Sequence, residues 1–217
     1  MMPSAPIPFA GSELSEARHV CAFFNSEEEG YRVLLPFIRD GIRNGEKAIH
    51  VVNPGRRDSH LDRLAAAGID TADALHRGQL EIRTNTDSYL RDGRFDQDRM
   101  LAVFEQLATD RARQGYSLSR IVCQMDWAPT GSEHADSLVE FESRVNDVWN
   151  RHDDAVICVY DLAKCSGETV IDIIRTHPMV IVGGILQRNP FFVPPREFLR
   201  ERSSRRSAQS PGPIPVI

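Results

Sequence analysis

Short apolar runs alternate with longer amphipathic stretches through most of the chain. The runs are rich in valine, isoleucine, cysteine and aromatic residues, which favour β-strands. Several have few polar interruptions, as expected of strands whose two faces are both covered. The pattern predicts strands over 19–24, 47–53, 79–84, 119–127 and 155–162, and a last strand over 179–186.

The stretches between these runs have the spacing of amphipathic helices. The first begins with Ser26 as its N-cap, and Glu29 completes a capping box three residues later. Pro36 lies inside this stretch, so we expect either a kink or a helix that begins later. Further helices are predicted over 58–67, 96–114, 132–150 and 167–175.

Repeated alternation of strands and helices predicts parallel pairing through right-handed crossovers. We therefore expect an α/β fold of three layers, with a mostly parallel sheet flanked by helices. The two ends of the chain lack the alternation and are rich in proline, serine or arginine. The expected organisation is a disordered segment over 1–17, one α/β domain over 18–194 and a flexible tail over 195–217.

Composition narrows the classes of protein that fit. The 217 residues, 41% hydrophobic and 26% charged, suit one domain with a sizeable core. A formal net charge of −5 disfavours general binding of nucleic acid, which needs a basic face. No apolar run reaches the roughly 20 residues of a membrane span, and the N-terminus lacks a signal-peptide pattern. We expect a soluble, cytoplasmic protein with no membrane partner.

The carboxyl ends of the strands are the expected place for a ligand, because loops and helix N-termini meet there in parallel sheets. The predicted ends carry aromatic residues beside a few polar groups, a mixture typical of small-molecule pockets. The residues concerned are Phe24, Asn25, Ser26, Asn53, Arg83, Thr84, Asp126, Trp127, Tyr160 and Asp161.

Motifs of common enzymes are missing from the sequence. A phosphate-binding loop needs glycines and a lysine, whereas the first strand-to-helix turn reads FFNSEEEGY. Three successive carboxylates at this turn would repel a triphosphate, which disfavours ATP hydrolysis of the usual kind. Since GxSxG, HExxH and HxH spacings are also missing, we expect no catalytic residues and no enzyme.

The cysteines and histidines allow a second kind of site. No CxxC pair occurs, so Cys21, Cys123 and Cys158 are expected to be buried free thiols. His19 and Cys21 share one face of a predicted strand, which makes them candidate ligands of a His/Cys metal or haem site. His177 precedes a proline and is expected either to cap a helix end or to contact a ligand.

The predicted helix over 132–150 carries two glutamates, Glu140 and Glu142, which flank Phe141. Their spacing points the two side chains away from each other, and we expect a solvated face there. Phe141 and Trp149 are expected to belong to the core.

Several segments occur in the order and spacing of a known family. They read HVCAFFNSEEEGYRVLLPFIRDGIRNGEKAIHVV, GQLEIRTNTDSYLRDGRFDQDRML, SRIVCQMDWAPTG, LVEFESRVN, VICVYDLAK and THPMVIVGG, and they extend over 18–192. Together they resemble the MEDS sensory domain, named for methanogens, methylotrophs and a dichloromethane-responsive regulator. Positions that match its pattern are His19, Cys21, Phe24, Gly45, Glu46, Tyr89, Gly93, Phe95, Arg120, Trp127, Glu142, Cys158, Tyr160, Asp161, His177 and Asn189.

The resemblance implies a RecA-like or KaiC-like core whose phosphate loop has degenerated. It also implies a role in prokaryotic signalling or transcription regulation, with hydrocarbon-derived or similar small molecules as the signal. Members of the family often carry a helix-turn-helix or kinase-type output module, and this sequence shows none. The way in which a signal would leave the domain therefore stays open.

The leading hypothesis is a sensory module that binds a small molecule and acts through a signalling partner or a homodimer. The expected ligand-binding residues are His19, Phe24, Asn25, Tyr89, Trp127, Tyr160, Asp161 and His177. No cofactor is assigned.

Three alternatives remain beside this hypothesis. The first is a nucleotide-binding RecA-like protein with an altered phosphate loop, and the second is a His/Cys metal or redox sensor. The third is an interaction protein that uses the arginine-rich segment 196–206, although such a segment is usually only solvated.

Overall fold

The computed structural model describes residues 5–128 and 134–209. A seven-stranded sheet lies at its centre, with strand order β5-β4-β6-β7-β3-β8-β9. All neighbouring strands pair in parallel except β8 and β9, which are antiparallel. The predicted α/β fold with a mostly parallel sheet is confirmed. The strands are β3 (His19–Phe24), β4 (Lys47–Val52), β5 (Leu80–Thr84), β6 (Ser119–Gln124), β7 (Ala155–Asp161), β8 (Met179–Val182) and β9 (Ile185–Arg188).

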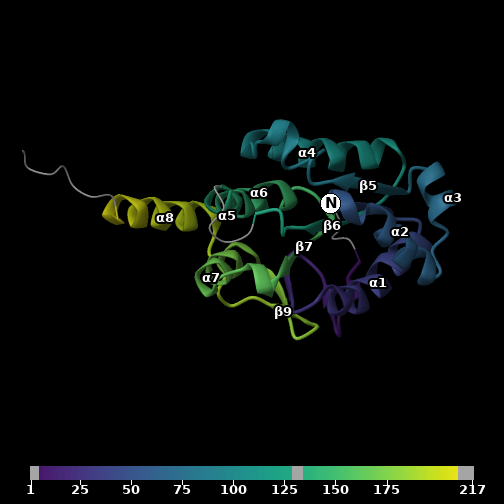
Figure 1. Ribbon diagram of the computed structural model, residues 1–217, viewed down its shortest axis with the longest axis horizontal. Coiled ribbons are helices and arrows are strands. Elements are labelled where there is room, and N and C mark those ends of the chain that lie inside the picture. The colour runs from purple at the N-terminus through teal and green to yellow at the C-terminus, as the bar shows by residue number, and fades with distance from the viewer. Residues whose placement is uncertain (1–4, 129–133, 210–217) are drawn as a thin grey trace, which may run out of the picture.

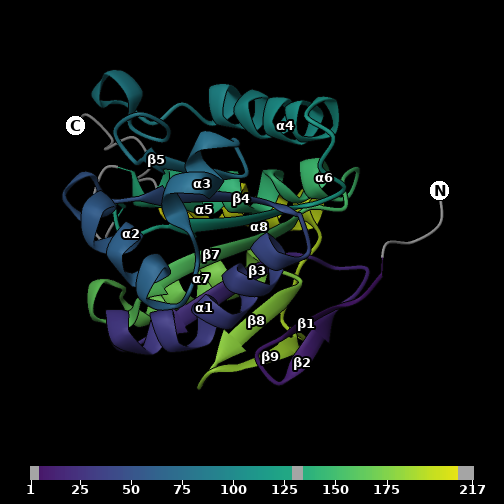
Figure 2. The same ribbon diagram turned by 90° about the vertical axis from the view of Figure 1, so that its right-hand side faces the viewer.

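Helices cover both faces of the sheet, as Figures 1 and 2 show. Each face carries its own cluster of buried apolar side chains, so the sheet has a core on either side. Strand β3 illustrates the division, because Val20 and Ala22 belong to one cluster while Cys21 and Phe23 belong to the other. One face packs against α1 (Glu27–Arg43), α2 (Arg57–Ala66) and α3 (Thr71–His76), and the other against α4 (Gln97–Arg113), α5 (Ala135–Arg144), α6 (Asn146–Trp149), α7 (Gly167–Thr176) and α8 (Pro195–Gln209).

Helix α1 begins as its capping residues predict. The Ser26 side chain accepts a hydrogen bond from the Glu29 backbone N–H, and the Glu29 carboxylate accepts one from the Asn25 backbone N–H. The helix starts at Glu27 and continues through Pro36, so the expected alternative of a later start is wrong. Burial of Phe37 and neighbouring apolar residues against the sheet offsets the cost of an interior proline.

Residues 7–14 form regular structure in a segment where we expected disorder. Strands β1 (Ile7–Phe9) and β2 (Ser12–Leu14) form an antiparallel hairpin across a turn at Ala10 and Gly11, both of which have positive φ. Ile7, Phe9 and Leu14 are buried, and the Phe9 ring packs 4.3 Å from the ring of Phe37. Strands of three residues are too short to give a periodic signal, which explains the wrong prediction for this part of 1–17.

The arginine-rich tail also differs from its prediction. Residues 195–209 form helix α8, which Figure 1 shows extending away from the rest of the domain. Phe198 at its start is fully buried, and Arg202 pairs with Asp172 at 2.7 Å and with Asp136. The residues that neutralise Arg202 come from α5 and α7, far away in the sequence, so composition alone predicted a solvated tail. The expected flexible end over 210–217 lies outside the described residues.

Two further boundaries differ from their predictions. The expected last strand over 179–186 is a hairpin of β8 and β9, which turns at Gly183 and Gly184, both with positive φ. Glycine suits these positions because it has no Cβ. The expected helix over 132–150 is divided into α5 and α6, and its predicted start at Ser132 lies outside the described residues.

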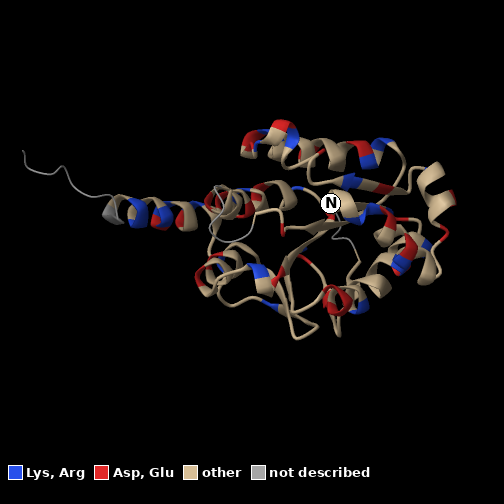
Figure 3. Ribbon diagram, viewed as in Figure 1, with Lys and Arg blue, Asp and Glu red and all other residues tan. Residues whose placement is uncertain are grey.

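The surface of the helices is charged with both signs. Figure 3 shows basic and acidic segments interspersed along α4 and α8. Within 5–128 and 134–209, the structure contains no helix long and apolar enough to cross a membrane.

Candidate functional site

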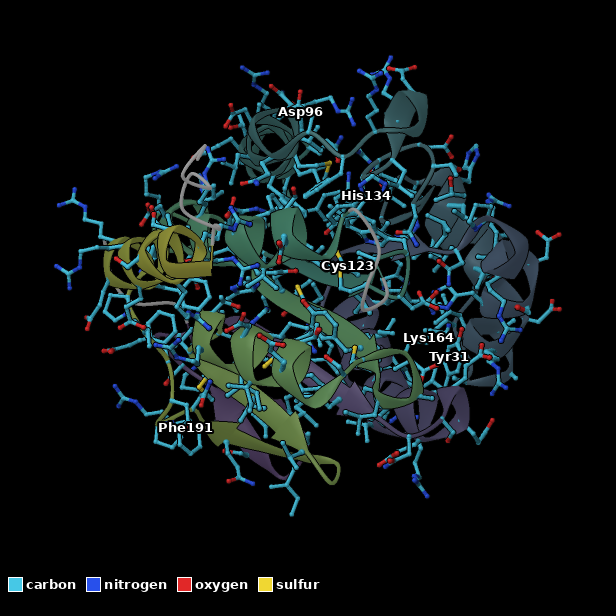
Figure 4. The ribbon with its side chains drawn as sticks, turned by 60° about the vertical axis from the view of Figure 1, so that its left-hand side comes forward. Tyr31, Asp96, Cys123, His134, Lys164 and Phe191 are labelled. Atoms are coloured by element: carbon cyan, nitrogen blue, oxygen red, sulfur yellow. The ribbon has the colours of Figure 1, made fainter. Side chains whose placement is uncertain are left out.

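A cavity of about 130 Å³ lies at the carboxyl edge of the sheet. It is bounded by the ends of β3, β4, β6 and β7 and by the first turns of α1 and the start of α2. Figure 4 places Tyr31 and Lys164, two of its lining residues, on the same side of the domain. The lining residues are Phe24, Ser26, Glu27, Gly30, Tyr31, Leu34, Ile38, His50, Val51, Val52, Asn53, Arg56, His60, Val122, Gln124, Asp126, Val159, Tyr160, Asp161 and Lys164.

Apolar side chains of one sheet face contribute much of the cavity lining. Val122 and Val159 come from neighbouring strands, and Leu34 and Ile38 come from α1. Phe24 closes this group next to Gly30, where an added Cβ would lie 3.2 Å from the Phe24 ring. The absence of a side chain at Gly30 therefore lets the aromatic ring approach the helix.

Charged and amide groups make up another part of the lining. The Asn53 side-chain N–H donates to both carboxylate oxygens of Asp126 at 2.8 Å. Lys164 donates to Asp126 at 2.6 Å and lies 3.6 Å from Asp161. The two carboxylates surround Lys164, which raises its pKa and leaves little positive charge unneutralised at the cavity.

A chain of three polar side chains also lines the cavity. The Tyr31 hydroxyl lies 2.8 Å from His60 Nδ1, and His60 Nε2 lies 2.8 Å from His50 Nδ1. His50 Nε2 is buried and has no hydrogen-bond partner in the part of the chain that the structure describes. Burial lowers the pKa of His60 to about 4 and holds the pKa of His50 well below its usual range, so both imidazoles are neutral at pH 7.

A second polar cluster lies on the opposite face of the sheet, between β3, β7, α5 and the end of α7. It consists of His19, Glu142, Cys158 and His177, one potential metal-ligand atom of each lying within 4.8 Å of the others. The Glu142 Oε2 atom is 3.2 Å from His19 Nε2 and 3.4 Å from His177 Nε2. The Cys158 Sγ atom is 3.5 Å from His19 Nε2 and 3.7 Å from Glu142 Oε2. None of the four side chains is more than 3% exposed.

Further polar groups hold this cluster in place. The Asn146 amide donates to the backbone oxygens of Glu142, Ser143 and Thr176, which turns its own Oδ1 toward His19 Nδ1 at 3.0 Å. His177 Nδ1 lies 2.9 Å from the Ile173 carbonyl oxygen.

The electrostatics of the cluster follow from this burial. Burial alone would raise the pKa of Glu142, yet contact with His177 and His19 holds it far below its usual range. Burial, followed by the neighbouring His177, lowers the pKa of His19. Burial and the Glu142 carboxylate raise the pKa of the Cys158 thiol. The cluster therefore combines one strongly held carboxylate with two imidazoles and a thiol.

The residues expected to form one pocket lie in four places. Phe24, Tyr160 and Asp161 line the cavity, whereas His19 and His177 belong to the buried cluster. Asn25 is exposed at the start of α1. Tyr89 and Trp127 stack on each other with ring centroids 4.9 Å apart, inside an aromatic group that includes Phe95 and Phe141.

Tyr160 takes part in both the cavity and the buried cluster. Neighbouring strand residues point to opposite faces, and Val159 packs on the cavity side. The Tyr160 ring stacks with Phe23 on the other side, and its hydroxyl donates a 2.9 Å hydrogen bond to Glu142 Oε1. Tyr160 therefore lines the cavity and, through its hydroxyl, also contacts the buried cluster.

The burial of Glu142 overturns one expectation. We expected a solvated face at this position, but Glu142 is fully buried. Helix α5 packs on the sheet through Leu138, Val139 and Phe141, and this turns Glu142 inward toward the two histidines. Its place among the family-matching positions was the one signal in the sequence for this role.

The predictions for the cysteines and for two core aromatic residues are confirmed, and three residues that line the cavity were not predicted. Cys21, Cys123 and Cys158 are buried free thiols, and Phe141 and Trp149 lie in the core, as predicted. Of the two candidate metal ligands, His19 belongs to the four-residue cluster and Cys21 does not. His50, His60 and Tyr31 were not predicted, because their pairing depends on how α1 and α2 pack against β4.

Comparison with known proteins shows the family of the chain. The chain is 22% identical over 180 residues to the transcriptional repressor DcmR of Methylorubrum extorquens, an alignment that covers 80% of this chain. The chain spans 63% of the length of that relative. The family model of the MEthanogen/methylotroph, DcmR Sensory domain matches residues 18–178 of the chain. This range includes strands β3 to β7, the residues that line the cavity and all four residues of the buried cluster. The chain thus belongs to the MEDS family of sensory domains.

Proposed function

We propose that this domain binds a small, largely apolar molecule in the cavity at the carboxyl edge of the sheet and passes the signal to a regulatory partner or to a second copy of itself. The cavity carries the proposal, because it combines apolar side chains with polar groups that could orient a ligand. Membership of a family of sensory domains supports the same role.

The size of the cavity favours a small ligand. An apolar cavity of about 150 Å³ is large enough to hold benzene, and this one has about 130 Å³. Val122, Val159 and Phe24 would contact the apolar part of the ligand. His50 Nε2, which is unpartnered among the described residues, would form a hydrogen bond with a hydroxyl group of the ligand, as donor or acceptor according to the tautomer of His50.

The chemistry of the rim argues against a triphosphate. Glu27, Glu28 and Glu29 occupy the first turn of α1, where a phosphate loop would present backbone N–H groups. Lys164, a cation at the rim, is already paired with Asp126 and Asp161. We therefore propose a RecA-like core whose phosphate site has been lost, and nucleotide binding is the competing hypothesis that the experiment must test.

The output of the domain is proposed from the relative. DcmR is a transcriptional repressor, and its alignment with this chain covers 80% of the chain. We propose that occupancy of the cavity alters a surface that a transcription regulator or another signalling protein recognises.

A thermal-shift screen tests the ligand proposal. Purified protein is melted with a panel of short-chain alcohols, ketones, carboxylates and halogenated alkanes, and separately with ATP, ADP and cyclic nucleotides with and without Mg²⁺. A ligand at about 100 times its Kd stabilises the folded chain by about 2.7 kcal/mol. We expect hits in the first panel, whereas hits among nucleotides alone would favour the competing hypothesis.

Two valine variants locate the binding place of any hit. Val159→Phe adds bulk to the cavity and should abolish the thermal shift. Val182→Phe makes the same change at an exposed position of β8, 52% accessible, and should leave the shift intact. A shift that survives in Val159→Phe would mean that the ligand binds elsewhere.

A further inference from the structure

The buried cluster of His19, Glu142, Cys158 and His177 has the geometry of a closed metal site. A tetrahedral zinc ion with bonds of about 2.0–2.3 Å holds its ligand atoms about 3.3–3.6 Å apart. Four of the six distances between the candidate atoms are 3.2, 3.4, 3.5 and 3.7 Å, and all six lie within 4.8 Å. The four side chains thus surround a point that is suited to a small tetrahedral cation.

The hydrogen bonds of the histidines decide which nitrogen faces this point. Asn146 turns its Oδ1 toward His19 Nδ1, and the Ile173 carbonyl oxygen faces His177 Nδ1. Both oxygens accept only, so each Nδ1 carries a proton and donates. In a neutral imidazole the other nitrogen then has a lone pair. Both Nε2 lone pairs therefore point into the cluster, as they do in metal-ligating histidines whose second nitrogen is held by a carbonyl or amide oxygen.

Without a cation, this arrangement places lone pairs against each other. The two Nε2 atoms face the acceptor oxygen Oε2 of Glu142 at 3.2 and 3.4 Å. His177 Nε2 makes no hydrogen bond to any residue within 5–128 and 134–209, although it is fully buried. A buried acceptor without a donor costs free energy, and a metal ion would satisfy all of these atoms at once.

Charge balance agrees with a divalent ion. Two neutral imidazoles, one carboxylate and one thiolate carry two negative charges, so a divalent cation makes the buried site neutral. The Glu142 oxygen that does not face the centre accepts from the Tyr160 hydroxyl at 2.9 Å, which orients the carboxylate.

We propose that His19 Nε2, His177 Nε2, Cys158 Sγ and Glu142 Oε2 bind a zinc-type divalent cation. A thiolate with two imidazoles favours zinc over magnesium or calcium, which prefer oxygen ligands. Four protein ligands leave no open position for a water molecule, so the ion has a structural or regulatory role and not a hydrolytic one. It links β3, β7, α5 and the end of α7, which are distant in the sequence.

This site lies across the sheet from the cavity and does not depend on the proposed ligand. If the chain binds no metal, the thermal-shift screen still tests the ligand proposal. If the screen gives no hit, the metal analysis still tests the metal site.

Metal analysis of the native chain is the first test. Protein purified without chelators should contain about one zinc ion per chain, as measured by inductively coupled plasma mass spectrometry. After removal of zinc, added Co²⁺ should produce visible d–d bands of tetrahedral strength and a thiolate-to-cobalt charge-transfer band in the near ultraviolet. A folded wild-type chain that holds no zinc and gives no thiolate band with Co²⁺ would overturn the proposal.

Two cysteine variants assign the band to the cluster. Cys158→Ala should remove the charge-transfer band and weaken zinc binding at least tenfold. Cys123→Ala changes a buried cysteine in register with Cys158 on the neighbouring strand β6, outside the cluster, and should keep both. Equal loss in the two variants would contradict the assignment, and if Cys158→Ala does not fold, the cobalt spectrum of the wild-type chain decides the matter.

Discussion

The Tyr160 hydroxyl donates a 2.9 Å hydrogen bond to Glu142 Oε1, and this bond joins strand β7 to helix α5. Val159, the residue before Tyr160, packs on the opposite face of the same strand and lines the cavity. Strand β7 is therefore the wall that the cavity and the buried cluster share, and the two sites lie back to back across one layer of sheet.

Replacing Tyr160 tests how much this hydrogen bond contributes to the free energy of unfolding. Tyr160→Phe removes the hydroxyl and leaves Glu142 Oε1 buried with one donor fewer. We expect the free energy of unfolding, measured by urea denaturation, to fall by about 1–3 kcal/mol.

The matched control for this variant is Tyr116→Phe. The Tyr116 hydroxyl donates to the Arg77 carbonyl oxygen at 3.2 Å in an exposed setting. This change should alter stability by less than about 0.5 kcal/mol. Equal losses of stability in the two variants would show that the hydrogen bond to Glu142 contributes no more than an exposed one.

The histidine chain of the cavity makes stability depend on pH. Burial lowers the pKa of His60 to about 4 from an ordinary value of 6.5, so between these values the unfolded chain binds more protons. Stability is therefore complete above about pH 6.5 and is lost as pH falls toward 4, by up to about 3 kcal/mol from this group. His50 adds to the loss in the same direction.

Urea denaturation at a series of pH values measures this dependence. His60→Gln should flatten the curve between pH 6.5 and 4, the ordinary and lowered pKa of His60. His76→Gln, at an exposed position, should leave the slope as in the wild-type chain. A wild-type curve without a slope in this range would mean that His60 is not held neutral.

Helix α8 depends on one aromatic anchor. Phe198 is fully buried beneath the Arg175 guanidinium, whose carbon lies 5.4 Å from the ring centroid. Phe198→Ala should lower the free energy of unfolding or of α8 detachment by about 3–5 kcal/mol and should make residues 195–209 sensitive to limited proteolysis.

Phe191→Ala is the control for the anchor, because Phe191 is 67% exposed and projects from the surface in Figure 4. It should change stability by less than about 0.5 kcal/mol. Rapid cleavage of α8 in the wild-type chain would contradict the anchored helix.

Removal of the proposed metal should lower the melting temperature. At a free zinc concentration about 100 times Kd, binding contributes about 2.7 kcal/mol, which corresponds to roughly 5–10 °C for a chain of this size. Scanning calorimetry with zinc and with a chelator measures the difference. Glu142→Gln should remove most of the zinc-dependent shift, whereas Glu140→Gln, two residues away and outside the cluster, should retain it.

The sequence by itself determined the layered architecture and most element ranges. Strand β3 matches its prediction at both ends, and the Ser26 cap and the start of α1 agree with the capping box. These features are local, because apolar periodicity and cap chemistry act over a few neighbouring residues. The family resemblance was readable for the same reason, since it rests on short segments in order.

The tertiary structure alone decided which of these residues meet. The sequence predicted a solvated helix face at Glu142. In the folded chain, α5 packs on the sheet and Glu142 faces His19 and His177. The alternation of side chains along β7 places Val159 and Tyr160 on opposite faces, so residues predicted to share one pocket are separated by the sheet. Contacts between distant segments carry no local periodicity, and this is why the cavity, the buried cluster and the anchored α8 became visible only in the folded chain.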